Sequence, residues 1–256
     1  MIKNLIDTHA HLTCNRLYPR IDEIVASAKT AGLKRILVVC TNLEEFYRAK
    51  KYKEKNDMIR IALGFHPGDV EGVDEQAIQG LLQSIVDRDI IAIGEIGLDY
   101  HYEPYDENKQ KSLFIKQIQL ANKYKLPILI HMRDATKDTL DILKKYAKTK
   151  FLMHCFSGSV ESANIVQAMG GYLSFAGVIT FKNAKGLLNV ASTVASHRLF
   201  VESDAPYLTP HPFRGKENES KYIVYTFDKI AELKQMEPQK LAEQMEQNFY
   251  DFFQVE

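Results

Sequence analysis

The segment IIAIGEIGLDY, residues 90–100, is a β-branched apolar run that carries Glu95 and Asp99 among its hydrophobic residues. Near-continuous apolar runs of this kind are typical of parallel strands that are buried on both faces of a sheet. Seven more such runs are spaced along the chain: LIDTHAHL (5–12), RILVVCT (35–41), IRIALGFHP (59–67), PILIHMR (127–133), FLMHCFSG (151–158), GYLSFAGV (171–178) and LFVESDAPYL (199–208).

Longer segments with helical periodicity separate these runs and follow the last one. The predicted helices lie near residues 21–31, 43–55, 75–87, 106–124, 135–148, 160–169, 183–196, 218–233 and 238–254. This alternation predicts an α/β fold, a (β/α)₈ TIM barrel that forms a single domain over residues 1–256. The alternative is an open doubly wound sheet, which the absence of a glycine-rich phosphate fingerprint after the first run disfavours.

The composition is that of an ordinary globular protein. Hydrophobic residues make up 45% of the 256 residues, and 33 basic side chains balance 33 acidic ones. This neutral balance gives no support to coating of duplex nucleic acid, which usually needs a basic excess. Three widely spaced cysteines, no signal-peptide pattern in MIKNLIDTHAHL and no long apolar span predict a cytoplasmic protein without disulfides or membrane contact. No obligate protein partner is evident.

Polar side chains lie toward the carboxyl ends of most of these runs. Those able to bind a metal or to form hydrogen bonds are Asp7, His9, His11, His66, Glu95, His131, His154 and Asp204. In a TIM barrel the carboxyl ends of all eight strands meet on one face, where active sites of this fold lie. Side chains nearly two hundred positions apart are therefore predicted to converge.

The pair His9 and His11 has the spacing that puts two imidazoles on the same face of a strand. Imidazoles combined with carboxylates suit Zn, Mn, Fe or Co, and Mg where carboxylates and water dominate. The predicted metal ligands are His9, His11, Glu95, His131, His154 and Asp204. The competing interpretation is that these histidines are core residues with ordinary hydrogen bonds and that Glu95 is paired with a lysine.

Seven segments carry a resemblance to a known family: DTHAHL (7–12), GFHP (64–67), GEIGLDY (94–100), LPILIHMRDA (126–135), MHCFSG (153–158), ESDAPYLTP (202–210) and RGKENE (214–219). In this order and spacing the chain resembles the TatD-type metal-dependent deoxyribonucleases, a branch of the amidohydrolase-like barrels. The resemblance covers nearly the whole chain. Ser220 departs from it, because the family commonly has proline there, and this puts the shape of the loop in doubt rather than the chemistry.

The resemblance implies a site for two divalent metal ions, with Mg, Mn or Zn as candidates. One ion would be held by His9, His11 and Asp204, the other by His131 and His154, and Glu95 would bridge them. The implied activity is hydrolysis of DNA phosphodiesters by a 3′–5′ exonuclease that acts on single-stranded ends.

The resemblance also assigns catalytic roles to Asp204, Glu95, Glu202 and His66. We expect Asp204 to orient and deprotonate the attacking water, and Glu95 to hold the metals at their working distance. His66 would contact a substrate phosphate, although it can also be read as a turn residue before Pro67. Glu202 matches an acidic family position, and the alternative is a buried carboxylate that only supports the barrel.

Substrate contacts are predicted at the mouth of the barrel. Phosphate contacts are assigned to His66, Arg133, Arg214 and Lys216, and the alternative for the three cations is a solvated surface charge. Stacking on DNA bases is considered for Tyr100, Tyr102, Phe156 and Phe213, with packing in the core or rim as the favoured alternative.

Two further residues lie close to the predicted ligands in sequence. Asp99 is either a hydrogen-bond partner of a metal-binding histidine or the N-cap of the following helix. Cys155 follows His154, and alternation along a strand predicts that its thiol faces the helices, which argues against a nucleophilic role.

Two other functions compete with the deoxyribonuclease. One is an amidohydrolase or esterase that uses the same metals on a small molecule or an aminoacyl ester, since one barrel hosts many chemistries. The other is a non-catalytic metal-binding or nucleic-acid-binding protein, which the complete ligand set argues against. The prediction of a hydrolase depends on the ligands, and the step to a deoxyribonuclease depends on the resemblance.

Overall fold

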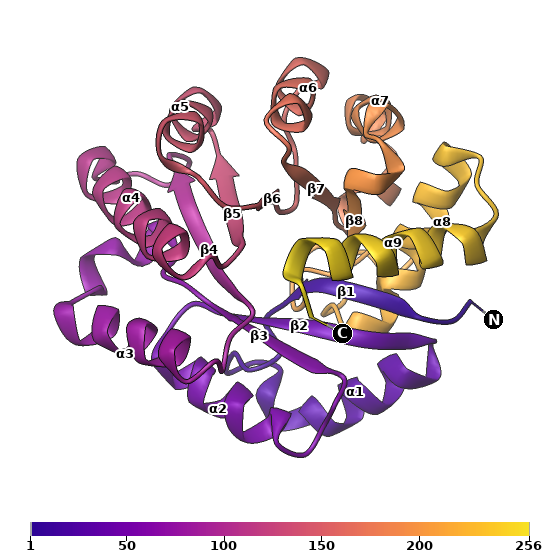
Figure 1. The fold of residues 1–256 in the computed structure, drawn as a ribbon. Helices are drawn as coiled ribbons and strands as arrows, with labels where there is room; N and C mark the ends of the chain where they lie inside the picture. Colours follow the sequence, from indigo (N-terminus) through magenta and orange to yellow (C-terminus); the bar gives the residue numbers. More distant parts are fainter. Residues whose placement is uncertain (1, 256) are drawn as a thin grey trace.

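The computed structural model describes residues 2–255 and contains one sheet of eight parallel strands that are paired in chain order (Figure 1). The strands are β1 (Leu5–Ala10), β2 (Leu33–Cys40), β3 (Ile59–Leu63), β4 (Ala92–Asp99), β5 (Ile128–Arg133), β6 (Phe151–Met153), β7 (Tyr172–Phe175) and β8 (Leu199–Val201). The predicted (β/α)₈ barrel is therefore confirmed, and the open doubly wound sheet is wrong.

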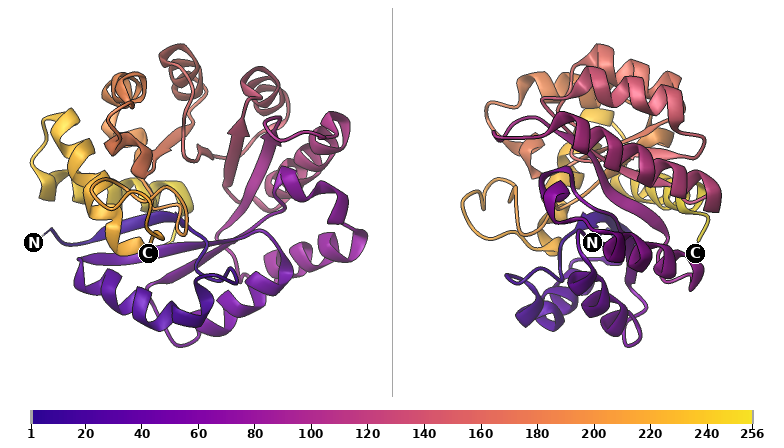
Figure 2. Two further views of the ribbon diagram at one scale, coloured as in Figure 1. Left: turned by 180° about the vertical axis from the view of Figure 1, so that it is seen from behind. Right: turned by 90° about the vertical axis from the view of Figure 1, so that its left-hand side faces the viewer.

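Helices surround the sheet on its outer side, except for the last one, which lies across one end of the barrel (Figures 1 and 2). They are α1 (Ile21–Thr30), α2 (Leu43–Lys53), α3 (Glu75–Val86), α4 (Glu107–Tyr124), α5 (Thr136–Tyr146), α6 (Val160–Ala168), α7 (Lys185–Thr193), α8 (Ile223–Lys234) and α9 (Pro238–Phe253). Asn42, Asp74, Asp106 and Ser159 cap the amino ends of α2, α3, α4 and α6. Each accepts a hydrogen bond from an otherwise unpaired backbone amide.

Several strands end earlier than the apolar runs predict. β1 ends at Ala10, β6 at Met153 and β8 at Val201, so the final residues of those runs leave the sheet. Of the predicted ligands in these three runs, His11, His154 and Asp204 lie in the final segments, whereas His9 lies within β1. Apolar periodicity alone could not show this change of direction.

The barrel is nearly closed between its first and last strands. No ladder joins β1 to β8 within the described residues, but an isolated parallel bridge pairs Ala10 with Ala205. The backbone nitrogen of Asp204 donates to the carbonyl oxygen of His9 at 2.9 Å, and that of His11 donates to Ala205 at 2.8 Å. The seam is therefore closed at the end of the barrel that carries the polar residues.

The hydrophobic core has an outer and an inner part, because side chains alternate along the strands. In β2, Ile36, Val38 and Cys40 belong to the part that packs against the helices, whereas Leu37 and Val39 face the barrel interior. The interior also contains Phe249, Phe252 and Phe253 of α9. This helix therefore closes one end of the barrel.

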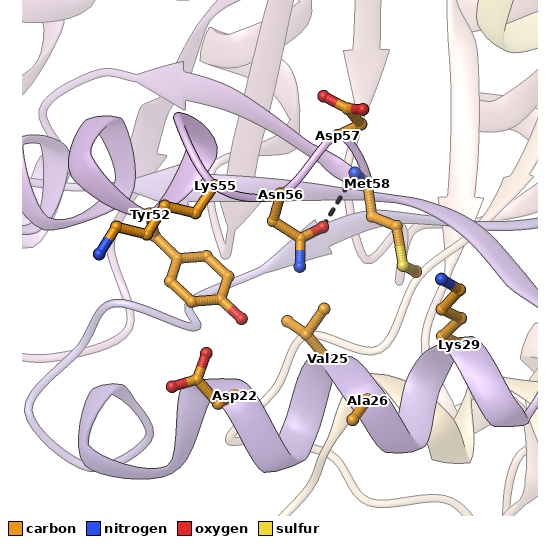
Figure 3. A pocket seen from close by; sticks show the side chains of 9 residues that line it. All are labelled: Asp22, Val25, Ala26, Lys29, Tyr52, Lys55, Asn56, Asp57 and Met58. Carbon is orange, nitrogen blue, oxygen red and sulfur yellow. Dashed lines mark hydrogen bonds between the residues drawn. The ribbon is translucent and has the colours of Figure 1, made fainter.

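The long loop between β8 and α8 lies at the opposite end from α9, as the two views of Figure 2 show. A separate groove of about 430 Å³ lies on the outer surface between α1 and the end of α2 (Figure 3). Its lining includes Asp22, Lys29, Tyr52 and Met58, and none of the predicted site residues. None of the helices described between residues 2 and 255 combines the length and hydrophobicity needed to cross a bilayer.

Candidate metal centre

The six predicted metal ligands come from five different strands and meet at one end of the barrel. His9, Glu95 and His131 lie within β1, β4 and β5, while His11, His154 and Asp204 lie just beyond β1, β6 and β8. Sets of their nitrogen and oxygen atoms lie close enough together to hold a metal ion. The structure therefore brings together donors that are up to 195 positions apart in the sequence, as 204 minus 9 gives.

Two irregularities in the sheet underlie the direction of two of these side chains. The pairing register shifts between Asp7 and Ala10 in β1, around His9, and between Ile93 and Ile96 in β4, around Glu95. Such bulges re-aim side chains and are over-represented beside active sites. Without these shifts, strict alternation along the strands would not turn His9 and Glu95 to the opposite side from their apolar neighbours.

Glu95 lies at the middle of the cluster and divides its two carboxylate oxygens between two groups of histidines. Its Oε1 atom lies 2.6 Å from His131 Nδ1 and 2.7 Å from His154 Nε2. Its Oε2 atom faces His9 Nε2 at 3.4 Å and His11 Nε2 at 3.7 Å. This is the geometry of a carboxylate that can bridge two ions.

The group around Oε2 has the spacing expected of ligands that share one ion. His9 Nε2 and His11 Nε2 are 3.2 Å apart, and Asp204 Oδ1 lies 3.6 Å from His11 Nε2 and 4.0 Å from His9 Nε2. Donors that each lie about 2.1 Å from one metal are separated from one another by about 3 to 4 Å. His9, His11, Asp204 and one oxygen of Glu95 therefore fit a divalent ion.

The second group consists of His131, His154 and the other oxygen of Glu95. The distance between His154 Nε2 and His131 Nδ1 is 3.4 Å. The far nitrogens of both rings have acceptors: His131 Nε2 contacts Asp99 Oδ2 at 2.9 Å, and His154 Nδ1 contacts Glu202 Oε1 at 3.2 Å. An acceptor on the far nitrogen fixes the tautomer so that the near nitrogen offers its lone pair, as in metal-binding histidines.

The first group shows this feature in one of its two histidines. His11 Nδ1 lies 3.0 Å from the carbonyl oxygen of Val39, so Nε2 would offer its lone pair to the cluster once an ion displaces its proton. His9 is fully buried, and its Nδ1 has no hydrogen-bond partner within the described residues. The ring of His9 instead stacks on that of His154, with centroids 4.1 Å apart.

His66 lies beside the cluster but has a different hydrogen-bonding state. Its Nδ1 atom accepts from the backbone nitrogen of Gly68 at 3.0 Å, so the proton of the neutral ring is on Nε2. Nε2 lies 3.9 Å from Glu95 Oε1. Burial lowers the pKa of His66 to about 4, so the ring is neutral at pH 7. It presents a hydrogen-bond donor rather than a metal ligand.

The charges within the cluster stabilise one another. Burial raises the pKa of Glu95, but His154, His131 and His9 together lower it well below its usual value. Burial likewise opposes ionisation of Asp204, and its histidine neighbours, His11 first, lower its pKa. Burial lowers the pKa of His11, but Asp204 and Glu95 raise it to about 9. The carboxylates are therefore ionised, and in the ion-free protein His11 carries a proton at pH 7.

Two acidic residues lie behind the histidines. Asp99 accepts a hydrogen bond from His131, which confirms its predicted role as a histidine partner, whereas Asp106 caps the following helix. Glu202 is fully buried between His154 and Ser174, whose hydroxyl lies 2.5 Å from Glu202 Oε2. Glu202 was predicted to be catalytic, and its position is that of a residue that orients His154.

The predicted phosphate-binding cations are exposed, and each lies against an aromatic ring. Arg133 follows His131 on β5 and contacts Tyr102, whose hydroxyl accepts from Arg133 Nη1 at 3.2 Å. Arg214 lies 4.3 Å from the centroid of Phe181, and Lys216 lies 5.4 Å from that of Phe213. No hydrogen bond or ion pair within the described residues joins any of the three to the metal ligands.

The structure decides between the alternatives for some neighbouring residues. Phe156 is buried in the hydrophobic core, so it cannot stack on a base. Tyr100 is half-buried and already stacks on Tyr105. Cys155 lies beyond β6 in a turn with a φ of 42°, so strand alternation does not set its direction. Burial and the charges of Asp204 and Glu202 raise its thiol pKa well above the usual value, which keeps it protonated.

Sequence reasoning missed three residues that support or border the site. Asn218, fully buried, donates from Nδ2 to the carbonyl oxygens of Ser203 and Tyr207, each at 2.6 Å. Gly97, on β4, allows β5 to approach closely. Tyr207 is an exposed aromatic residue beside His11, with ring centroids 6.3 Å apart. Its place in the segment DAPYL, three residues after Asp204, was the available signal.

Comparisons with known proteins agree over the whole chain. The model of a family described as TatD related DNase matches residues 6–254. YabD, an uncharacterized metal-dependent hydrolase of Bacillus subtilis (strain 168), is 40% identical over 253 residues, which cover 98% of this chain and 99% of that protein. YcfH, an uncharacterized metal-dependent hydrolase of Escherichia coli (strain K12), is 33% identical over 257 residues, with coverage of 98% and 96%. The crystal structure of YJJV, a TatD homologue from Escherichia coli K12, has a TM-score of 0.94 at 29% identity and covers 100% of both chains.

Proposed function

The chain belongs to the TatD-related DNase family of metal-dependent hydrolases, and from this premise we propose that it is a two-metal 3′–5′ exodeoxyribonuclease that acts on single-stranded ends. The observation that carries the proposal is the position of Glu95, whose two oxygens face two separate groups of histidines. A bridging carboxylate of this kind supports a pair of ions rather than one. The ions themselves would be Mg, Mn or Zn.

Bound ions would activate a water molecule for attack and neutralise charge on the phosphoryl oxygens. The protein would supply the proton transfers. Asp204 directs Oδ1 at His9 and His11, while its Oδ2 has no hydrogen bond within residues 2–255 and can accept a proton from the attacking water. The Nε2–H of His66 points toward the cluster and would donate to a phosphate oxygen.

The surroundings of the site support a phosphate-containing substrate. Arg133, Arg214 and Lys216 are exposed and are each anchored by a neighbouring aromatic ring. Since the chain as a whole is neutral, these cations would bind the end of a single DNA strand near the site rather than coat a DNA duplex. All three cysteines are free, in keeping with the reducing cytoplasm that we propose as its compartment.

The proposal is tested by incubating the purified protein with single-stranded DNA and Mg²⁺, Mn²⁺ or Zn²⁺, and by sizing the products over time. We expect stepwise release of mononucleotides that stops with a chelator or a blocked 3′ end. Asp204→Ala should fold normally by circular dichroism and lose hydrolysis, because it removes a metal ligand and the proton acceptor together. Arg198→Ala, which alters a cation that hydrogen-bonds to Gly170 outside the metal centre, is the matched control with retained activity.

Two outcomes would contradict this function. Near-wild-type hydrolysis by Asp204→Ala would show that the cluster is not the active site. Absence of DNA cleavage with every metal, together with turnover of amide, carboxyl-ester or aminoacyl-ester substrates, would identify the enzyme as an amidohydrolase or esterase that uses the same donors.

A further inference from the structure

Tyr207 is an exposed aromatic residue beside His11, at one accessible edge of the metal centre. Its side chain is 52% exposed and its ring is inclined by 70° to that of His11. Within the centre, the side chains of His11, Asp204 and His131 keep 11%, 13% and 16% of their surface exposed, whereas His9 is fully buried. A substrate that reaches the centre from the side of His11 and Asp204 therefore passes Tyr207.

The backbone that carries Tyr207 is fixed to the same centre. Its nitrogen donates to the carbonyl oxygen of Asp204 at 2.8 Å. Its carbonyl oxygen accepts from the buried Asn218, which also holds Ser203. The ring is thus positioned relative to the metal donors before any substrate binds, which reduces the entropy lost on binding.

A cation also orients the ring. The guanidinium carbon of Arg16 lies 5.6 Å from the ring centroid of Tyr207, within the range of cation–π attraction. Glu217 holds Arg16 through contacts at 3.2 Å to Nε and 3.1 Å to Nη2. The hydroxyl of Tyr207 forms no hydrogen bond within the described residues. A structural hydrogen bond of this hydroxyl is therefore not the reason for a tyrosine at this position.

We propose that Tyr207 is the platform on which the base of the nucleotide next to the scissile phosphodiester stacks, with Arg16 holding the ring in place. The inference rests on the proposed nuclease function and names the residue that recognises the base. Stacking on an aromatic ring is tolerant of sequence, because every base has a π face. The platform would therefore bind all four nucleotides. It would require the terminal base of the DNA strand to be free of base pairing.

A fluorescence experiment tests the contact directly, because the chain has no tryptophan. Tyr207→Trp would place a single indole at the platform. We expect saturable quenching by a single-stranded oligonucleotide with phosphorothioate linkages, which slow its cleavage, and little quenching by the same strand with an abasic 3′-terminal nucleotide. Tyr250→Trp is the matched control, because Tyr250 is 53% exposed on α9 at the other end of the barrel.

Steady-state kinetics supply the second test. Loss of one base–aromatic stack corresponds to about a 5- to 150-fold rise in KM, and we expect this for Tyr207→Ala with kcat nearly unchanged. Tyr207→Phe, which keeps the ring, should restore KM. The wild-type enzyme should show the same loss on the abasic strand, and Tyr207→Ala should show no additional loss on that strand, because the two changes remove the same contact.

The outcomes separate this inference from the proposed function. Equal losses for Tyr207→Ala on normal and abasic strands, no loss on either, or equal quenching in Tyr250→Trp would each overturn the platform. Quenching at position 207 without cleavage of any DNA would retain the platform and reject the nuclease. If the protein neither binds nor cleaves single-stranded DNA, both proposals are wrong.

Discussion

Glu95 links the two halves of the candidate site through single carboxylate oxygens, with Oε1 near His131 and His154 and Oε2 near His9 and His11. Glu202 also lies within 4.8 Å of one histidine of each group, His9 and His154, but its hydrogen bond is to the far nitrogen of His154. We therefore expect the acidic residue at position 95 to determine whether the centre holds one ion or two.

Replacement of Glu95 by glutamine should reduce the metal content of the protein below two ions per chain and abolish turnover. The amide keeps the size of the side chain but offers one neutral oxygen instead of two charged ones. Metal analysis after dialysis would measure the content. As a control, Glu243→Gln on α9 should leave the content unchanged. A Glu95→Gln protein that still binds two ions tightly would contradict the bridging role.

Glu202 should act through His154 rather than on substrate, because it is buried behind the ring. Glu202→Gln is expected to weaken metal binding by about 10- to 100-fold, as for other partners of metal-binding histidines. The measurement is a titration with Mn²⁺, with activity followed at increasing Mn²⁺ concentration. Recovery of activity at high Mn²⁺ would support positioning, whereas a loss that no metal concentration restores would indicate a direct catalytic role.

Metal affinity should increase with pH. In the ion-free protein the pKa of His11 is raised to about 9, so below that pH an ion must displace a proton from the imidazole. For each proton displaced, affinity is expected to fall by about tenfold per pH unit below pH 9. Titration calorimetry in buffers of different ionisation enthalpy would detect the proton release. A metal affinity that does not change with pH would contradict the role of His11 as a metal ligand. As a control, His197→Gln, which changes an exposed histidine, should leave the dependence of metal affinity on pH unaltered.

At the residue scale the sequence predicted which polar side chains converge, because their positions in the apolar runs showed that they share one end of the barrel. That they bind metal stays a prediction. Exposure cannot be read from one sequence, so base stacking and core packing both stay open there for Phe156, which lies in the core, and the exposed Tyr207 is not singled out. Strand alternation does not apply to Cys155, because the strand ends at Met153.

Strand β4 shows why the site depends on whole elements. Gly97 is paired with His131 of β5 and has a φ of 148°, and a Cβ atom built there would lie 1.9 Å from the carbonyl oxygen of His131. Only glycine allows this approach. With the two strands this close, His131 Nδ1 lies 2.6 Å from Glu95 Oε1.

Gly97→Ala should therefore displace β5 from β4 and disrupt metal binding more than it unfolds the protein. Metal titration together with thermal unfolding would separate the two effects. Gly186→Ala is the matched control, because a Cβ atom there meets nothing within 4 Å. Unchanged metal affinity in Gly97→Ala would mean that the close pairing is not needed to place His131.

At the scale of elements, apolar periodicity predicted the strands and helices but not where the strands end. The runs around His11, His154 and Asp204 contain enough apolar residues to be read as strand, yet the backbone there turns across the barrel mouth. The register shifts in β1 and β4 leave no signal in hydrophobicity. Both features depend on tertiary contacts between strands.

In the molecule as a whole, the aromatic residues of α9 that stabilise the barrel lie at one end, and the candidate metal centre lies at the other. α9 places Phe249, Phe252 and Phe253 at one end of the interior, and the candidate metal ligands lie toward the carboxyl ends of the strands, at the other end. Phe252→Ala should lower the free energy of unfolding by about 3–5 kcal/mol, because it leaves a cavity, while metal affinity stays unchanged. Chemical denaturation would measure this, with Tyr250→Ala as the exposed control on the same helix. An equal loss of metal affinity in Phe252→Ala would contradict the separation.

The central claim is that this TatD-family hydrolase holds two ions bridged by Glu95. It is tested most directly by anomalous diffraction from crystals of the protein soaked in Mn²⁺. We predict two anomalous peaks about 3.5–4 Å apart, one among His9, His11 and Asp204 and the other beside His131 and His154, with Glu95 between them. A single peak, or two peaks that Glu95 does not join, would contradict the account.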